Sequence, residues 1–172
     1  GLEIPESSPQ FSSESAVHSA IGQGNHAYTT AQLARYVAAI ANGGTVYDLS
    51  LISKVTDSSG NTISENSPQV YGEAELSPST WNCIQTGMYE VIENMASYSE
   101  MAINVAGKTG TAQQTESRPN HALFIGYAPY ESPELAVSCR ISFGYTSSNA
   151  AEVCRDIFSC YFGLADRDTL IT

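Results

Sequence analysis

Three apolar runs joined by short links limit the fold of this chain more than any other feature. The runs span residues 103–113, 122–128 and 135–143, and they contain many β-branched and aromatic side chains. Links this short favour antiparallel neighbours, because parallel strands need a long crossover connection. The link 129–133 has a proline at each end, which is typical of a turn. The sequence therefore predicts a three-stranded antiparallel sheet.

Upstream of this sheet, apolar residues at helical spacing predict a first helix. Thr29 or Thr30 can cap its start, and the Asn-Gly-Gly turn at 42–44 ends it, because glycine adopts the left-handed conformation easily. Residues 45–56 are rich in β-branched and aromatic side chains and read as one strand of a hairpin. Residues 64–76 read as a polar loop.

Two further helices are predicted. The second begins with Ser77 as its cap and Pro78 at its first position. The third spans about 149–162, where Asn149 and Glu152 can form a capping box. Its expected buried face consists of Ala150, Val153, Cys154, Ile157, Phe158 and Tyr161.

The element order is helix, hairpin, helix, three strands, helix, which predicts an α+β fold with helices packed on an antiparallel sheet. We expect residues 1–172 to form one partial domain, with Gly163 ending the last helix and a loose polar tail from about 164. The net charge is −11 and the pI is about 4.4, so a nucleic-acid partner is disfavoured, because phosphate binding needs clustered basic residues.

The four cysteines are Cys83, Cys139, Cys154 and Cys160. They form no C-x-x-C pair and have no histidine nearby in the sequence, so the pattern does not support a metal site. All four lie within apolar patterns, and we expect buried free thiols, although disulfides remain open.

The segment around Lys108 has the composition of an anion site. Lys108 is one of only two lysines, and it lies between Gly107 and Thr109, followed by Gly110 and Thr111. Small residues let another molecule approach the backbone, the lysine supplies a positive charge, and the hydroxyls supply hydrogen-bond donors. A carboxylate or an oxyanion needs these groups.

A nucleotide-binding loop is a poor explanation of the same segment. The motif G-x-x-x-x-G-K-[ST] requires a glycine at 102, where the chain has Ala102, and a helix after the lysine. Here a strand is predicted to continue instead.

Five blocks occur in a fixed order over nearly all of residues 1–163: Gly-Leu-Glu-Ile-Pro-Glu at 1–6, Ala-Ile-Gly-Gln-Gly at 20–24, Thr-Ala-Gln-Leu-Ala at 30–34 with Ile-Ala-Asn-Gly-Gly at 40–44, Ala-Gly-Lys-Thr-Gly-Thr-Ala-Gln at 106–113, and Phe-Ile-Gly-Tyr-Ala-Pro at 124–129. Lys-Thr-Gly is one of three elements that penicillin-recognising serine enzymes share. With these blocks, the chain resembles the C-terminal half of the transpeptidase domain of penicillin-binding proteins, most closely class B.

The resemblance implies a partial β-lactamase/transpeptidase-like fold and a role for each residue of the motif. The backbone N–H of Thr111 would belong to the oxyanion hole. The side chains of Lys108, Thr109 and Thr111 would hold the carboxylate of a peptidoglycan stem peptide or a β-lactam, and they would also tune the proton network. Gly110 would leave room for a ligand to lie along the strand. No metal or organic cofactor is implied.

The nucleophilic serine of this family lies in an S-x-x-K element, which this sequence does not contain. The residues three before Lys54 and Lys108 are Leu51 and Val105. Three S-x-N triplets, at 59–61, 64–66 and 147–149, lie in positions that fit chance occurrence. We expect the chain to be inactive alone and to need the N-terminal half of the same domain. The alternative is a non-catalytic module that recognises peptidoglycan or a β-lactam without acylation.

The resemblance also implies an extracytoplasmic place in the bacterial cell envelope, with the parent protein anchored in the cytoplasmic membrane. His121 begins a predicted strand near the Lys108 segment. It could act as a general base, but we favour a polar residue at a strand end.

Overall fold

A three-stranded antiparallel sheet forms the centre of the molecule, which is represented by a computed structural model describing residues 4–7, 17 and 27–170. The strands lie in the order β5 (Ala106–Ala112), β6 (His121–Ala128) and β7 (Leu135–Ile141). In the register, Thr109 pairs with Phe124, and Phe124 pairs with Cys139. The predicted antiparallel sheet is confirmed.

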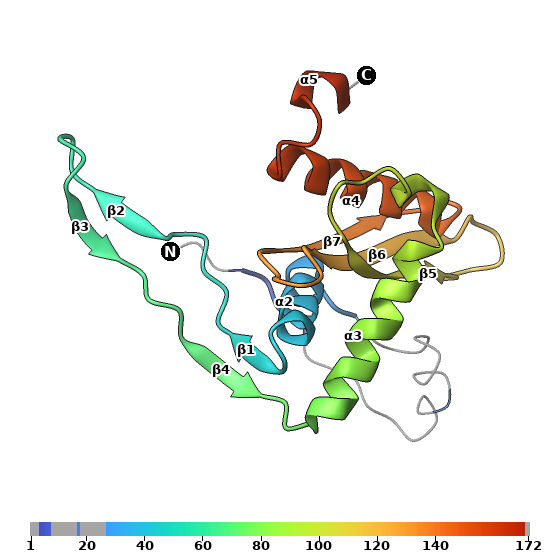
Figure 1. Cartoon of the computed structure of the whole chain (residues 1–172), viewed down its shortest axis with the longest axis horizontal. Helices are drawn as coiled ribbons and strands as arrows, with labels where there is room; N and C mark the ends of the chain where they lie inside the picture. The colour runs from blue at the N-terminus through green and yellow to red at the C-terminus, as the bar shows by residue number, and fades with distance from the viewer. Residues whose placement is uncertain (1–3, 8–16, 18–26, 171–172) are drawn as a thin grey trace.

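Helices cover both faces of this sheet (Figure 1). Helix α2 (Thr30–Ala41) and helix α4 (Ser147–Tyr161) contact strands β6 and β7 through two different core clusters. Phe124 belongs to the α4 cluster and Tyr127 to the α2 cluster, as expected for residues an odd number of positions apart on one strand. Helix α3 (Pro78–Glu93) packs against β5 and contributes to both clusters. The predicted α+β fold is confirmed.

The predicted caps of α2 and α3 are also confirmed. Thr29 is the N-cap of α2 and forms a capping box with Gln32, whereas Ser77 caps α3 by accepting a hydrogen bond from the N–H of Thr80. After α2 the chain turns at Gly44, where φ is +117° and an added Cβ would lie 2.7 Å from the Trp81 ring. The glycine therefore allows both the turn and the close approach of α3.

The segment between α2 and α3 differs from the sequence prediction. The expected strand 45–56 is two strands, β1 (Thr45–Tyr47) and β2 (Lys54–Thr56). β2 pairs with β3 (Thr62–Glu65), whereas β1 pairs with β4 (Val70–Glu73), which lies inside the expected polar loop. These two ribbons project away from the sheet as an arm (Figure 1). Most of their side chains are exposed, so the sequence of the arm shows no sustained alternation of apolar and polar residues. Such an alternation would have indicated where one strand pair ends and the next begins.

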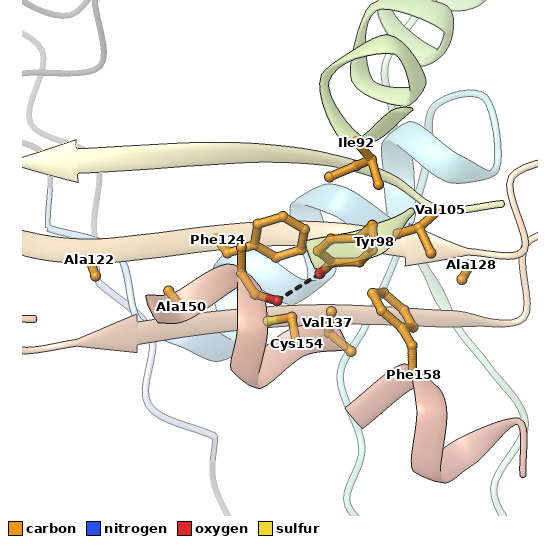
Figure 2. Close-up of a cluster of buried hydrophobic side chains, with 11 residues drawn as sticks. Ile92, Tyr98, Val105, Ala122, Phe124, Ala128, Val137, Ala150, Cys154 and Phe158 are labelled. Carbon is orange, nitrogen blue, oxygen red and sulfur yellow. Dashed lines mark hydrogen bonds between the residues drawn. The ribbon is translucent and has the colours of Figure 1, made fainter. Parts of the chain in front are cut away.

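The larger core cluster lies between the sheet and α4 (Figure 2). Tyr98, at the end of the 3-10 helix η1 (Ala96–Tyr98), stacks on Phe124 with ring centroids 6.1 Å apart. Its hydroxyl donates a 2.7 Å hydrogen bond to the carbonyl of Ala151 in α4. Burial raises the pKa of Tyr98, which keeps this hydroxyl protonated as a donor.

Replacing Tyr98 with phenylalanine is expected to lower the free energy of unfolding by about 1 kcal/mol. The ring stays in place, and only a buried hydrogen bond is lost. Urea denaturation of the two proteins measures the difference. An unchanged midpoint would show that this hydrogen bond does not stabilise the attachment of α4.

Helix α4 begins two residues earlier than predicted, at Ser147, with Thr146 as its N-cap. The predicted capping box of Asn149 and Glu152 is therefore wrong. The Asn149 amide instead donates a 2.8 Å hydrogen bond to the carbonyl of Gly144, which joins the first turn of the helix to the preceding loop.

The predicted buried face of α4 is correct only in part. Ala150, Cys154 and Phe158 are buried, but Val153, Ile157 and Tyr161 are 42%, 42% and 59% exposed. Ala151 and Ser159 are buried in their place, so the contact face is rotated toward the small residues that let the helix approach the sheet. Gly163 follows the helix with a φ of +65°, as predicted, and the tail contains a short helix α5 (Arg167–Leu170).

The cysteines are free, but they are not all buried as predicted. Cys154 is buried and Cys139 is half-buried, whereas Cys83 and Cys160 are exposed. Burial raises the pKa of the Cys154 and Cys139 thiols, so both are protonated at neutral pH. Within the described ranges, no helix is long and apolar enough to cross a membrane.

Candidate functional site

Strand β5 lies at an edge of the central sheet and carries the whole Lys-Thr-Gly-Thr segment. β6 is its only strand partner in the part of the chain that the structure describes. An edge strand presents unpaired backbone N–H and C=O groups on its free side. Residues 108–111 are therefore held in extended form by β6, and their other side has no strand partner among the described residues.

The side chains of this segment alternate between the two faces of the sheet. Thr109 and Thr111 share the face of Phe124, whereas Lys108 and Gly110 lie on the opposite face. Lys108 and Thr111 are exposed, and the two residues between them are half-buried. The amine of Lys108 and the two threonine hydroxyls therefore come from opposite faces of the same edge strand, within the four residues 108–111.

Lys108 makes no ion pair with another described residue. Its Nζ donates a 2.7 Å hydrogen bond to the carbonyl of its neighbour Thr109. In the described residues, the ion pairs are Arg35 with Glu6 and Arg155 with Asp156, and neither involves this lysine. Lys108 therefore retains a positive charge that can meet an anion.

The two glycines that flank Lys108 differ in what surrounds them. A Cβ added to Gly107 would lie 2.5 Å from the ring of Phe124 and 3.0 Å from Ile92 of α3. At Gly110 the nearest atom to an added Cβ is the Cβ of Leu123, at an ordinary contact distance of 3.4 Å. Packing within the chain therefore requires a glycine at 107 but not at 110.

This contrast predicts different effects of the same substitution. We expect Gly107→Ala to lower the free energy of unfolding by about 1–3 kcal/mol, because it overpacks the core. Gly110→Ala is expected to change it by less than about 0.5 kcal/mol. Urea denaturation of both variants tests the difference, and equal losses would contradict it.

Three hollows in the described part of the molecule are lined by residues other than 108–111. One apolar hollow lies between α2 and β4, where Tyr36, Tyr71 and Trp81 contribute to its lining. The guanidinium of Arg35 lies 4.9 Å from the centre of the Tyr71 ring there. These three hollows therefore do not include the Lys-Thr-Gly-Thr segment.

Gln32, in the block 30–34, holds the residue that directly follows the block 1–6. Its side-chain amide donates to the carbonyl of Ser7 at 2.9 Å, and its amide oxygen accepts from the Ser7 N–H at 3.0 Å. The neighbouring Glu6 and Arg35 form a 2.7 Å ion pair. These contacts fix the segment 4–7 on α2, so we assign these blocks a structural role. The block at 20–24 lies outside the described residues.

His121 is the first residue of β6, so the prediction of a polar residue at a strand end is confirmed. Only 6% of it is exposed, and both ring nitrogens have partners within the chain. It is therefore not free to act as a general base in this arrangement. The sequence places a histidine at the start of β6, but its burial depends on contacts with distant loops.

The three S-x-N triplets lie on elements other than β5. Residues 59–61 are in the β2–β3 turn, where the carboxylate of Asp57 accepts hydrogen bonds from the N–H groups of Ser59 and Asn61. Ser64 lies on β3 and not in the predicted loop. Residues 147–149 form the first turn of α4. Among the described residues, no group of three or more His, Cys, Asp or Glu could hold a metal ion.

Comparison with known proteins gives consistent matches. The family model of the penicillin binding protein transpeptidase domain matches residues 1–159. Penicillin-binding protein 2A of Bacillus subtilis is 27% identical over 97% of this chain and 27% of its own length. Peptidoglycan D,D-transpeptidase MrdA of Haemophilus influenzae is 28% identical over 82% of this chain and 25% of its own length.

A solved structure agrees with these matches. Penicillin-binding protein A from M. tuberculosis, in an imipenem acyl-enzyme complex, superimposes with a TM-score of 0.74 and 26% identity. The match covers 83% of this chain and 32% of that protein. The chain thus spans about a quarter of the length of the curated relatives. Since the family model covers most of the sequence and the relatives are class B proteins, the chain belongs to the penicillin-binding protein transpeptidase family.

Proposed function

We propose that strand β5 supplies one wall of the acyl-transfer site of a peptidoglycan D,D-transpeptidase. Lys108, Thr109 and Thr111 hold the carboxylate at the end of a stem peptide, and the N–H of Thr111 contributes to the oxyanion hole. The observation that carries this proposal is the exposed Lys108, without an ion pair in the described residues, on an open edge strand. A charged donor and two hydroxyls on an extended strand suit a carboxylate ligand.

The reaction consists of two acyl transfers. A serine hydroxyl attacks the carbonyl between the two terminal D-alanines, the C–N bond breaks, and the last D-alanine leaves with the serine proton on its nitrogen. An amine of a second stem peptide then attacks the ester, forms the cross-linking amide and returns a proton to the serine. In both steps the Thr111 N–H stabilises negative charge on the carbonyl oxygen.

β-Lactams are proposed to enter the same site, because they carry a carboxylate and a reactive amide. The acyl-enzyme complex of the M. tuberculosis relative with imipenem supports this assignment. Gly110 adds no side chain to the wall, so a ligand can lie close to the backbone of β5. The Gly110→Ala variant, which the fold tolerates, would narrow this approach.

The nucleophile is proposed to come from outside this sequence. No S-x-x-K element is present, and covalent catalysis by serine needs an activating base beside the hydroxyl. The proposed partner is the N-terminal half of the same domain, in a longer protein anchored at the cytoplasmic membrane and exposed to the cell wall.

Labelling with a fluorescent penicillin tests the function. We expect no covalent label on the 172-residue chain alone, and a label on the longer protein that includes an S-x-x-K segment. Binding without acylation by the longer protein would instead favour the non-catalytic recognition module. A stable label on the isolated chain would contradict the assignment of the nucleophile to another segment.

A further inference from the structure

His121 lies where the open strand ends, and the proposed acyl transfer does not use it. In the β5–β6 register it pairs with Ala112, the residue that follows Thr111. Its side chain is only 6% exposed. A buried polar side chain needs hydrogen-bond partners, and both partners of His121 lie on connections outside β6.

The two ring nitrogens have distinct roles. Nδ1 lies 3.0 Å from the backbone nitrogen of Phe143, which can only donate, so Nδ1 accepts and carries no proton. Nε2 lies 2.9 Å from the side-chain oxygen of Gln114, which can only accept, so Nε2 carries the proton. The two hydrogen bonds therefore favour the tautomer with the proton on Nε2.

These contacts join two connections of the sheet at the end of β5. Gln114 belongs to the β5–β6 connection (113–120), and Phe143 belongs to the β7–α4 connection (142–146). The N–H of Tyr145 also donates to the carbonyl of Asn120 at 3.1 Å. The guanidinium of Arg118 lies 5.2 Å from the centre of the Phe143 ring, a cation–π contact.

The β7–α4 connection has a backbone that needs such support. Phe143 and Tyr145 have φ values of +57° and +64°, which side-chain-bearing residues adopt rarely. Both of their N–H groups are held by the partners named above, His121 and Asn120. Such conformations persist when the surrounding structure fixes them, and they often occur beside functional sites.

We propose that His121 is a positioning residue for the acyl-transfer site. By accepting a hydrogen bond from the N–H of Phe143, it holds the β7–α4 connection against the start of β6, at the end of the Lys-Thr-Gly-Thr strand, and the contact with Gln114 orients its ring. The two connections near the Thr111 end of the strand are then held in a single conformation when the substrate binds. This inference rests on the proposed function. Positioning matters because a displacement of about 1 Å can lower a rate by roughly 100-fold.

Substitutions at His121 in the longer, serine-containing protein test the proposal. His121→Ala removes both contacts. His121→Asn places an amide oxygen near Nδ1 and can still accept from Phe143, whereas His121→Gln can reach only the Gln114 side. Thr115→Ala is the matched control, because this exposed residue lies on the same connection and its hydroxyl contacts only Ser117 among the described residues.

Acylation by a fluorescent penicillin is measured as a first-order rate constant and as a dissociation constant of the complex before acylation. We expect His121→Ala and His121→Gln to lower the rate constant by about 10–100-fold with little change in the dissociation constant. His121→Asn should recover most of the rate, and Thr115→Ala should match the wild type. Urea denaturation identifies variants that have lost their fold.

The outcomes separate the two proposals. If the wild-type longer protein is not acylated, the proposed function fails. If it is acylated and folded His121→Ala is acylated equally fast, only the positioning role fails. The role also fails if His121→Asn is as slow as His121→Ala while both are folded. Nitrogen NMR of the wild-type ring must find the proton on Nε2, and a proton on Nδ1 would overturn the proposal.

Discussion

Replacing Phe124 with alanine is expected to lower the free energy of unfolding by about 3–5 kcal/mol. Phe124 is fully buried at the centre of β6, where its ring contacts Tyr98 and closely approaches Gly107. The sheet cannot collapse into the space left behind, because β5 and β7 hold β6 on both sides. A domain of this size is stable by roughly 5–15 kcal/mol, so a large part of its stability would be lost.

Urea denaturation followed by circular dichroism measures this loss. Val55→Ala is the control, because Val55 lies on the projecting arm, where it is 45% exposed, and it should change the stability by less than about 0.5 kcal/mol. A loss below about 1 kcal/mol for Phe124→Ala would show that the two layers are not joined through this ring.

Replacing Lys108 with alanine is expected to slow acylation of the longer protein by penicillin about 100-fold. Losing a hydrogen bond to a charged group costs up to about 3 kcal/mol, and each 1.4 kcal/mol corresponds to roughly a tenfold change in rate. Stability should change little, because the side chain is exposed and makes no ion pair in the described part of the chain.

The other lysine provides the matched control. Lys54 is exposed on β2, in the arm that projects from the sheet, and Lys54→Ala should leave the acylation rate unchanged. The acylation rate constant divided by the dissociation constant is the quantity to compare. If both variants lost the same activity, the effect would come from net charge and not from the position of Lys108.

Local sequence signals predicted the parts of the fold that local interactions determine. The capping residues Thr29 and Ser77 bond to N–H groups three residues away, so their pattern is readable in the sequence. The short links between β5, β6 and β7 left the chain few alternatives to antiparallel pairing. The Lys-Thr-Gly-Thr segment was placed correctly on a strand for the same reason.

The sequence predictions were wrong where contacts between residues distant in the sequence determine the local structure. Helix α4 has more apolar residues than one contact face can bury, and its orientation follows from the small residues Ala150 and Ala151 that meet the sheet. The division between β1 and β2 depends on their different partners, β4 and β3. The strand-end position of His121 was predicted, but its burial was not, because it depends on contacts such as that with Phe143, 22 residues away.

The open side of β5 also has a consequence for solubility. A free strand edge is a template on which a second copy of the chain can add its own strand, which leads to aggregation. Natural proteins often place a lysine on such an edge, because pairing two copies would bring like charges together. Lys108 is thus expected to prevent β5 from pairing with β5 of a second copy of the chain. Its loss should promote self-association as well as weaken ligand binding. The residue proposed to bind the substrate is thus also expected to protect the strand from pairing with other copies of the chain.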